Sequence, residues 1–302
     1  MSVDTSVAMV VFNRPDVTSR VLEVVRAARP RHLLVVADGP RPSRPDDESR
    51  CAAVRALFDR IDWPCEVERE FSPVNLGCRR RVSSGIAWVF SRVEEAIVLE
   101  DDCLPHPTFF DFCAQLLDRH REDPRVMAIT GDNFQAGRRR GEASYYFSRF
   151  MHVWGWASWR RAWRHYDVSL RDWPERRETR WLEEVLGNRR AARNWSAIFD
   201  RTSAGEIDTW DYQWVYSIWA AGGLVATPNE NLVANIGAGA DATHTLASPF
   251  IGLPVQAMEF PLVHPAHVAA DDDADRFVQR SMFTPTLRAR VGATLRRLVR
   301  SR

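Results

Sequence analysis

Short apolar runs alternate with amphipathic segments along the first 135 residues of the chain. The runs predict strands, and the segments between them show the helical spacing of apolar residues. The predicted strands are 6–12, 32–40, 65–71, 95–102 and 125–134, and the predicted helices are 16–28, 51–61, 83–93 and 108–123. Apolar strands that alternate with helices are typical of an α/β fold, with a mostly parallel sheet covered by helices on both faces.

Polar residues follow four of these five predicted strands. They are Asn13-Arg14, Asp38-Gly39, Glu100-Asp101-Asp102 and Asp132-Asn133. In an open α/β sheet, ligands bind outside the carboxyl ends of the strands. We therefore expect a binding site along this edge of the sheet.

The second half of the chain has a different pattern. It holds ten of the twelve Trp, alternates helices with loops, and contains one short predicted strand, 223–228. We expect one domain over 1–265, made of the halves 1–135 and 136–265, followed by a tail over 266–302. In the tail, Leu287, Val291, Leu295 and Leu298 form one apolar helical stripe among arginines. Peripheral contact with an anionic membrane and ordinary packing on the domain or a partner explain this stripe equally well.

Composition narrows the class of protein. The 302 residues carry a net charge of +1, so no global field favours nucleic acid. All 41 basic residues are Arg, which leaves no Lys for Schiff-base chemistry. The five Cys contain no C-x-x-C pair, so we expect neither a disulfide framework nor a zinc site, and a cytoplasmic location fits best. The N-terminus does not resemble a signal peptide, and no apolar run approaches the ~20 residues of a membrane span.

The three adjacent acids after residue 99 suit a hard divalent cation. Mg²⁺ or Mn²⁺ typically takes one or two carboxylates, with phosphate oxygens and water as its other ligands. Alternate side chains of an extended chain face opposite ways, so all three acids meet one ion only if the strand turns. We expect Asp102 on the metal, Asp101 toward a ribose or sugar hydroxyl, and Glu100 beside them. A solvated turn with helix-capping acids is the alternative.

Other strand ends offer groups for an anionic ligand. Arg14 suits a phosphate. Asp38 suits a nucleobase or ribose, or is a turn residue before Gly39. The segment from Asn75 to Arg81 combines a glycine, three arginines and a helix start, which favours anions, although a solvated basic face explains it too.

Seven stretches together resemble GT-A fold glycosyltransferases, which have a Rossmann-like sheet. They occur in the family's order over about residues 6–245: VFNRP, VVADGP, NLGCRRRVSSGIAWVF, AIVLEDDCLPHPTFFDF, WGWASWRRAW, TWDYQWVYSIWAAGG and NLVANIGAGADATHT. The chain is most similar to bacterial family-2-like nucleotide-diphospho-sugar transferases. These are related to the animal N-acetylglucosaminyltransferase that begins complex N-glycan branching.

The resemblance implies roles for matching residues. Asn13, Arg14 and Asp38 would bind the nucleotide of the donor, and Asp102 would bind Mn²⁺. Asp211 would be the general base. The segment containing Trp156 would line the sugar or acceptor pocket, and His244 would lie near the phosphates or the metal. Nucleotide-sugar contacts are also expected from Asn75, Arg80, Arg81, Glu100 and Asp101.

Two departures from the family bear on these roles. The animal enzyme has a His where this chain has Arg79-Arg80-Arg81, so phosphate contacts there cannot be assigned to one arginine. It also has a second Asp directly after the one that matches Asp211. An inverting transfer needs one base for the acceptor hydroxyl and a cation at the leaving diphosphate, which Asp211 and Asp102 would supply. The alternative for Asp211 is a helix-capping acid, although Asp208 is the more natural cap.

The sequence thus predicts an inverting glycosyltransferase that uses Mn²⁺ or Mg²⁺. The expected donor is a UDP- or GDP-type nucleotide sugar, and the acceptor a saccharide, a lipid-linked sugar or a small molecule. A nucleotidylyltransferase is one alternative, but it usually needs a glycine-rich loop after the first strand and a Lys at the phosphates. The other alternative is a non-catalytic carbohydrate-binding protein on the same fold.

Overall fold

The computed structural model describes residues 4–237 and 252–283, and an eight-stranded sheet runs through that part. Its strand order is β3-β2-β1-β4-β8-β6-β9-β7, and a separate two-stranded ribbon joins β5 to β10. The strands are β1 (Val7–Val11), β2 (His32–Ala37), β3 (Glu66–Phe71), β4 (Glu95–Glu100), β5 (Cys103–Pro105), β6 (Val126–Thr130), β7 (Tyr145–Ser148), β8 (Trp156–Trp159), β9 (Leu224–Pro228) and β10 (Val233–Asn235).

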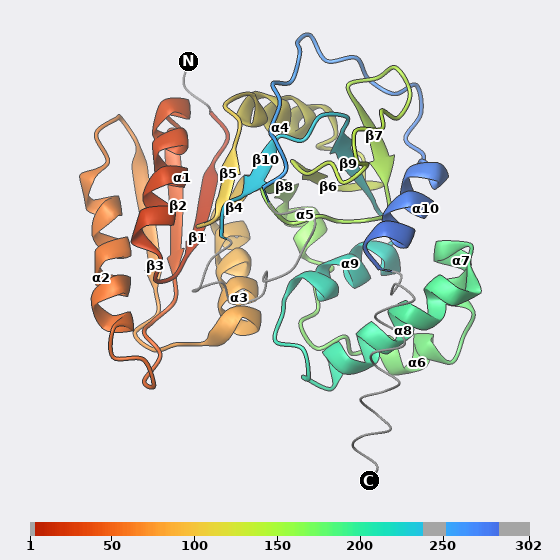
Figure 1. The fold of residues 1–302 in the computed structure, drawn as a ribbon, viewed down its shortest axis with the longest axis horizontal. Helices are drawn as coiled ribbons and strands as arrows, with labels where there is room; N and C mark the ends of the chain where they lie inside the picture. Colours follow the sequence, from red (N-terminus) through yellow and green to blue (C-terminus); the bar gives the residue numbers. More distant parts are fainter. Residues whose placement is uncertain (1–3, 238–251, 284–302) are drawn as a thin grey trace.

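Helices cover both faces of the sheet (Figure 1). They are α1 (Pro15–Ala28), α2 (Asp47–Leu57), α3 (Gly77–Arg92), α4 (Thr108–Arg119), α5 (Arg160–Trp163), α6 (Trp173–Arg177), α7 (Trp181–Leu186), α8 (Arg189–Ser203), α9 (Asp211–Ala220) and α10 (Asp272–Ser281), with a 3-10 turn at Phe58–Arg60. The helices α6 to α9 gather beside the second half of the sheet, away from α1 and α2.

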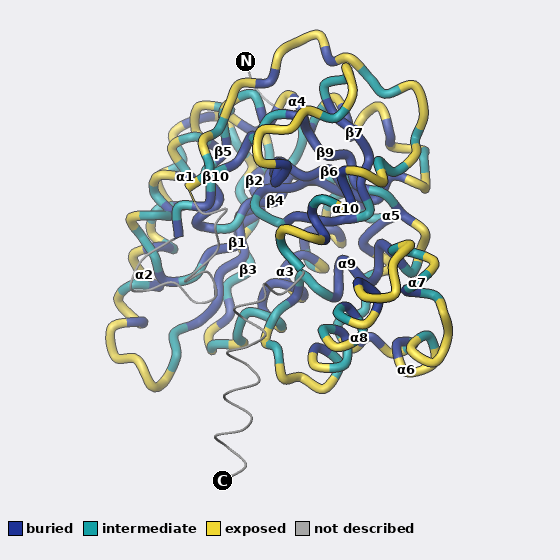
Figure 2. The backbone as a smooth tube through the Cα atoms, turned by 45° about the vertical axis from the view of Figure 1, so that its right-hand side comes forward, coloured by how far each residue is buried: buried dark blue, intermediate teal, exposed yellow. Residues whose placement is uncertain are grey.

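Two apolar cores form because successive side chains of a strand point to opposite faces. In β1, Val7, Met9 and Val11 face the core under α1, α2 and α4. Ala8 and Val10 face the other core, which holds α3 and most of the buried Trp. Figure 2 shows these strands as the buried centre of the molecule. Burial on both faces explains why the first strands are apolar without alternation.

The predicted α/β class, with a mostly parallel sheet flanked by helices, is confirmed. β1, β2, β3 and β4 are mutually parallel, and β6 pairs in parallel with β9. Two antiparallel strands of this sheet were not predicted: β8 lies between β4 and β6, and β7 pairs with β9. β8 is the segment that the resemblance assigns to pocket lining, whereas the structure buries all of it in the sheet.

The described part of the predicted tail packs against the domain. α10 buries Ala274 and Val278, and Asp275 accepts a hydrogen bond from the Ser148 hydroxyl at the end of β7 (2.6 Å). The apolar stripe from Leu287 to Leu298 lies outside the described residues. All five Cys are free thiols. None of the helices in the described ranges has the length and apolar character that crossing a bilayer requires.

Candidate active site

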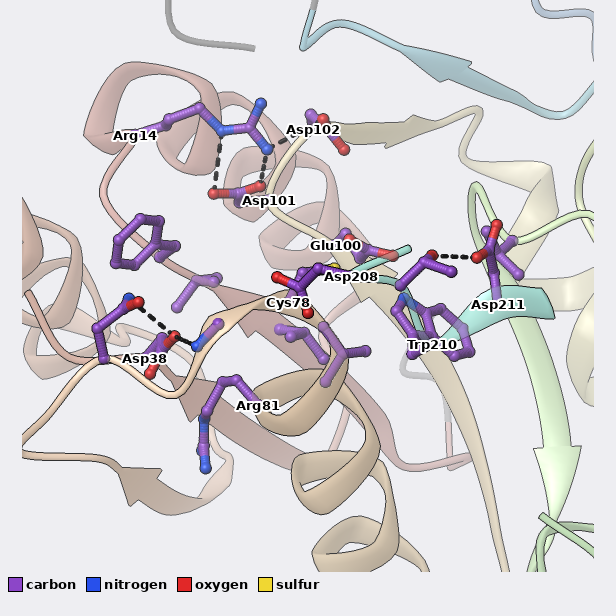
Figure 3. A pocket seen from close by; sticks show the side chains of 18 of the residues that line it. Arg14, Asp38, Cys78, Arg81, Glu100, Asp101, Asp102, Asp208, Trp210 and Asp211 are labelled. Carbon is purple, nitrogen blue, oxygen red and sulfur yellow. Dashed lines mark hydrogen bonds and ion pairs between the residues drawn. The ribbon is translucent and has the colours of Figure 1, made fainter. Parts of the chain in front are cut away.

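A cavity of about 320 Å³ opens at the carboxyl ends of β1, β2 and β4. Its walls also include the start of α3 and the segment before α9 (Figure 3). Eight of the residues predicted from the sequence line it: Arg14, Asp38, Asn75, Arg81, Glu100, Asp101, Asp102 and Asp211. The cavity therefore lies at three of the four polar strand ends from which a binding site was predicted, whereas Asp132 and Asn133 do not line it.

The three adjacent acids lie at a turn of the chain. β4 ends at Glu100, and the chain turns at Asp101 and Asp102 before β5 begins at Cys103. The amide of Asp101 donates to the carbonyl of Val10 (3.1 Å), so the turn starts beside the carboxyl end of β1. Because the chain turns here, the three carboxylates point in different directions (Figure 3).

Arg14 lies against two of these acids. Its Nε donates to Asp101 Oδ2 (3.3 Å), and its Nη2 donates to Asp101 Oδ1 and to Asp102 Oδ2, the latter at 3.0 Å. Burial alone would lower the pKa of Arg14, but the charges of Asp101 and Asp102 outweigh it and raise that pKa. The guanidinium is therefore charged, and the positive charge that offsets the acids here is the chain's own arginine.

Glu100 has a different environment from its two neighbours. Figure 3 places it between the Arg14 cluster and the wall that carries Asp211. Burial, followed by the charges of Asp102 and Asp101, raises the pKa of Glu100 to about 8. A carboxyl group with this pKa is mostly protonated at neutral pH and can donate a hydrogen bond. Glu100 can therefore donate a hydrogen bond to a ligand in the cavity.

Asp38 holds the start of α3. Its carboxylate accepts hydrogen bonds from the amides of Gly39 (2.9 Å), Leu76 (2.9 Å) and Gly77 (3.1 Å) and from Asn75 Nδ2 (3.0 Å). A helix leaves its first N–H groups without internal acceptors, and here a distant residue supplies them. This explains why α3 begins at Gly77, well before the predicted start at residue 83. These bonds give Asp38 a turn role, and its contact with a nucleobase or ribose stays a prediction.

The opposite wall is the segment from Asp208 to Asp211. Asp211 is the first residue of α9, and its Oδ1 accepts from the Thr209 hydroxyl and from the Tyr212 amide (2.9 Å). Asp208 accepts from the amide of Arg79 (3.2 Å). Asp208 therefore contacts the first turn of α3, whereas the sequence predicted it as the cap of α9.

Aromatic packing supports this wall from behind. Trp210 stacks on Trp156 with 5.7 Å between ring centroids. Trp214 lies 6.1 Å from Trp156 and 5.0 Å from Trp163. The Tyr166 hydroxyl donates to the carbonyl of Trp210 (3.2 Å). The Trp cluster is therefore mainly core, and it fixes the backbone that carries Asp211.

Four predicted site residues are not placed in the cavity. Asn13 is buried and donates to Asp47 Oδ1 (2.7 Å), so its side chain is engaged with the start of α2. Arg80 is exposed, and Trp156 is fully buried in the core. His244 lies outside the described residues.

Several lining residues were missed by sequence reasoning: Phe12, Arg41, Cys78, Trp154 and Asn235. Phe12 ends the first predicted strand, so its position was an available signal, whereas β10, which Asn235 ends, was not predicted. Arg41 gave none, because its place depends on its ion pair with Asp47 (2.6 Å) and on the Phe12 ring, 5.1 Å from its Cζ.

The residues at the turn fit a divalent cation that shares its ligands with a bound phosphate. Asp102 Oδ2 accepts from Arg14, while Asp102 Oδ1 is contacted by the Cys103 thiol at 3.5 Å, a weak donor. One carboxylate with phosphate oxygens and water is a usual Mg²⁺ or Mn²⁺ environment. Charge favours the same arrangement, because the described residues that line the cavity include five carboxylates besides Glu100 and only three arginines. An anionic ligand would gain from an added cation there.

A second group of ligand-type side chains lies at the other end of β2 and β3. It consists of His32, Glu66 and Glu68. His32 hydrogen bonds to Glu68 Oε1 (3.1 Å) and to Ser6 Oγ (3.2 Å), and Arg92 pairs with Glu68 Oε2 (3.3 Å). These contacts account for the group without a cation, so we assign no metal site there.

Comparison with known proteins identifies no family. No family model and no curated protein matches the chain. A solved mannosyltransferase from Pyrobaculum calidifontis, in complex with GDP-Man and Mn²⁺, shares 11% identity at a TM-score of 0.40, over 72% of this chain and 69% of that one. A UDP-glucose pyrophosphorylase bound to UDP-glucose shares 9% at a TM-score of 0.37, over 74% and 90%. A 4-diphosphocytidyl-2C-methyl-D-erythritol synthase from Anaerococcus prevotii shares 9% identity at a TM-score of 0.35, over 74% of this chain and 88% of that one. Values this low identify no activity.

Proposed function

We propose that the protein is an inverting, metal-dependent glycosyltransferase that moves a sugar from a nucleoside-diphosphate donor to an acceptor hydroxyl. The observation that supports this best is that one cavity holds two separate carboxylate groups. Asp102 lies with Arg14 at the end of β4, and Asp211 lies on the wall before α9. Such a transfer needs charge stabilisation at the leaving diphosphate and a base at the acceptor.

Each group has one role in the proposed reaction. Asp102 would hold Mn²⁺ or Mg²⁺, which when bound neutralises charge on the leaving diphosphate. Asp211 takes the proton of the acceptor hydroxyl. That oxygen attacks the anomeric carbon while the bond from this carbon to the diphosphate breaks, so the configuration inverts. The hydrogen bonds of Asp211 Oδ1 with Thr209 and Tyr212 orient the carboxylate for this step.

The resemblance to the N-acetylglucosaminyltransferase supports a nucleotide-sugar donor of UDP or GDP type. The acceptor would be a saccharide, a lipid-linked sugar or a small molecule. Nucleic acid is not an expected partner. Contact with a membrane through the segment after residue 284, and cytoplasmic location, stay predictions from the sequence.

The test is a screen of UDP- and GDP-sugars for hydrolysis and transfer with Mn²⁺ or Mg²⁺. Asp211→Asn should lower kcat by roughly 10²–10⁴-fold and keep donor affinity, because only proton transfer is lost. Asp102→Asn should lose the metal dependence of donor binding. Asp111→Asn, an exposed carboxylate on α4, is the matched control. Full transfer activity in folded Asp211→Asn and Asp102→Asn proteins would reject the proposal.

Two further assays separate the alternatives. A nucleotidylyltransferase would release pyrophosphate from a nucleoside triphosphate and a sugar 1-phosphate. The chain argues against this class, since it has no Lys and β1 is followed by Phe-Asn-Arg-Pro in place of a glycine-rich loop. A non-catalytic binding protein would show no turnover of any donor. A thermal shift that needs both Mn²⁺ and UDP or GDP would argue against a scaffold, whereas no shift with any nucleotide would reject our proposal.

A further inference from the structure

We propose that Arg14 is a tethered cation that competes with the divalent metal for Asp102 and moves to the donor diphosphate when metal and donor bind together. This inference rests on the proposed function. It goes beyond it by stating how the charges of the site are exchanged.

The contacts of Arg14 place its charge where a cation would bind. Nε and Nη2 are engaged with Asp101, and Nη2 also donates to Asp102 Oδ2 (3.0 Å). The side chains are enclosed, with exposed fractions of 18% for Arg14, 5% for Asp101 and 11% for Asp102. Water therefore screens this ion pair less than a surface pair.

The backbone at Gly237 encloses the pair from another direction. A Cβ at this position would lie 2.1 Å from Asp102 Oδ2 and 2.7 Å from Arg14 Nη1. Residue 237 has no side chain, and this permits the close approach of its backbone to Asp102 and Arg14. Asp102 Oδ2 thus has the guanidinium and the Gly237 backbone as neighbours, and a metal that binds this oxygen meets the positive charge of the guanidinium.

A bound diphosphate ends the competition between Arg14 and the metal for Asp102. A divalent cation and a guanidinium this close repel each other, so the metal alone should bind weakly. Phosphate oxygens offer Arg14 another anionic partner, one that its planar fork matches. Asp101 has bonds to both Nε and Nη2 of Arg14, so it can keep hold of Nε while Nη2 leaves Asp102. Asp101 is then a positioning residue for Arg14, and not the ribose ligand predicted from the sequence.

The test uses the full chain with Mn²⁺, UDP and GDP as probes. Electron paramagnetic resonance of free Mn²⁺ measures metal binding without nucleotide, and calorimetry measures nucleotide binding with Mn²⁺. Arg14→Met should bind Mn²⁺ alone at least about tenfold more tightly, since the competing charge is removed. It should bind UDP or GDP with Mn²⁺ at least about tenfold more weakly, since a phosphate partner is lost. Arg14→Lys keeps the charge and should keep the weak Mn²⁺ affinity.

The matched control is Arg20→Met, which removes an exposed arginine of α1 outside the cavity and should behave like wild type. If folded Arg14→Met binds Mn²⁺ no more tightly than wild type, the proposed competition is wrong. It is also wrong if neither wild type nor Arg14→Met binds Mn²⁺. Failure of the proposed function looks different: no nucleotide binds and no sugar is transferred, whatever Mn²⁺ does.

If Arg14→Met does not fold, the wild-type protein still gives a decision. The ¹⁵Nε signal of Arg14 is the arginine signal that Arg14→Lys lacks. It should shift when Mg²⁺ and UDP or GDP are added together, and much less with Mg²⁺ alone. A signal that neither addition moves overturns the proposal.

Discussion

Acid should destabilise the protein through a buried imidazole beside the cavity wall. His152 precedes the lining residues Val153 and Trp154, is only 6% exposed, and packs edge-on against Phe134 with 4.6 Å between ring centroids. Burial lowers the pKa of His152 from 6.5 to about 3. In the unfolded chain the imidazole titrates near its ordinary value. Between these two values the unfolded state binds a proton that the folded state does not.

The sign and size follow from this difference in proton binding. Stability through His152 is complete above pH 6.5 and falls as the pH drops toward 3. Each pH unit in that window costs about 1.4 kcal/mol, so the change from pH 6.5 to pH 5 costs about 2 kcal/mol. Burial also lowers the pKa of His120, to about 4, so His120 adds a loss of the same sign.

Urea unfolding followed by Trp fluorescence at pH 7.5 and pH 5 tests this reasoning. His152→Phe keeps the ring volume and removes the titration. Wild type should lose about 2 kcal/mol more than His152→Phe between the two pH values. The control His165→Gln changes an exposed histidine and should follow wild type. Equal losses in wild type and His152→Phe would refute the role of a buried neutral imidazole.

Two further changes test contacts around the cavity. Gly237→Ala places a Cβ 2.1 Å from Asp102 Oδ2, so it should displace Asp102 and weaken Mn²⁺-dependent UDP or GDP binding about tenfold or more; unchanged affinity in calorimetry would contradict this close approach. Asp47→Asn removes the charge of the buried carboxylate that pairs with Arg41 Nε (2.6 Å). It should lower the free energy of unfolding in urea by about 1.5–3 kcal/mol. The neighbouring exposed Asp46→Asn should cost less than about 0.5 kcal/mol, and equal losses in the two variants would show that the ion pair does not stabilise the fold.

The strands that could be predicted are those whose own composition determines them. β1, β2 and β4 are apolar runs buried on both faces, and they were predicted within a few residues of their ends. β8 was missed because Trp-Ala-Ser-Trp has no β-branched residue and no alternation. It is a strand because β4 and β6 lie on its two sides, a fact of tertiary pairing that no local pattern records.

The same distinction between local pattern and tertiary pairing applies to the site. The edge of the sheet was predictable, because parallel strands end at the same edge whatever their partners. The partners of individual side chains were not. Asp38 and Asp208 bind amides near the start of α3, across long stretches of sequence, and neither contact has a local signature. Arg14 was assigned to a phosphate, and its pairing with Asp101 and Asp102 emerged only with the fold.

The absence of Lys has a consequence at this site that composition alone did not suggest. Arg14 contacts Asp101 through two nitrogens and Asp102 through one of them, which needs the planar fork of a guanidinium. A Lys could place one charge there but could not bridge both acids in a fixed orientation. A site whose acids are to stay neutralised until an anionic donor arrives therefore requires Arg at residue 14.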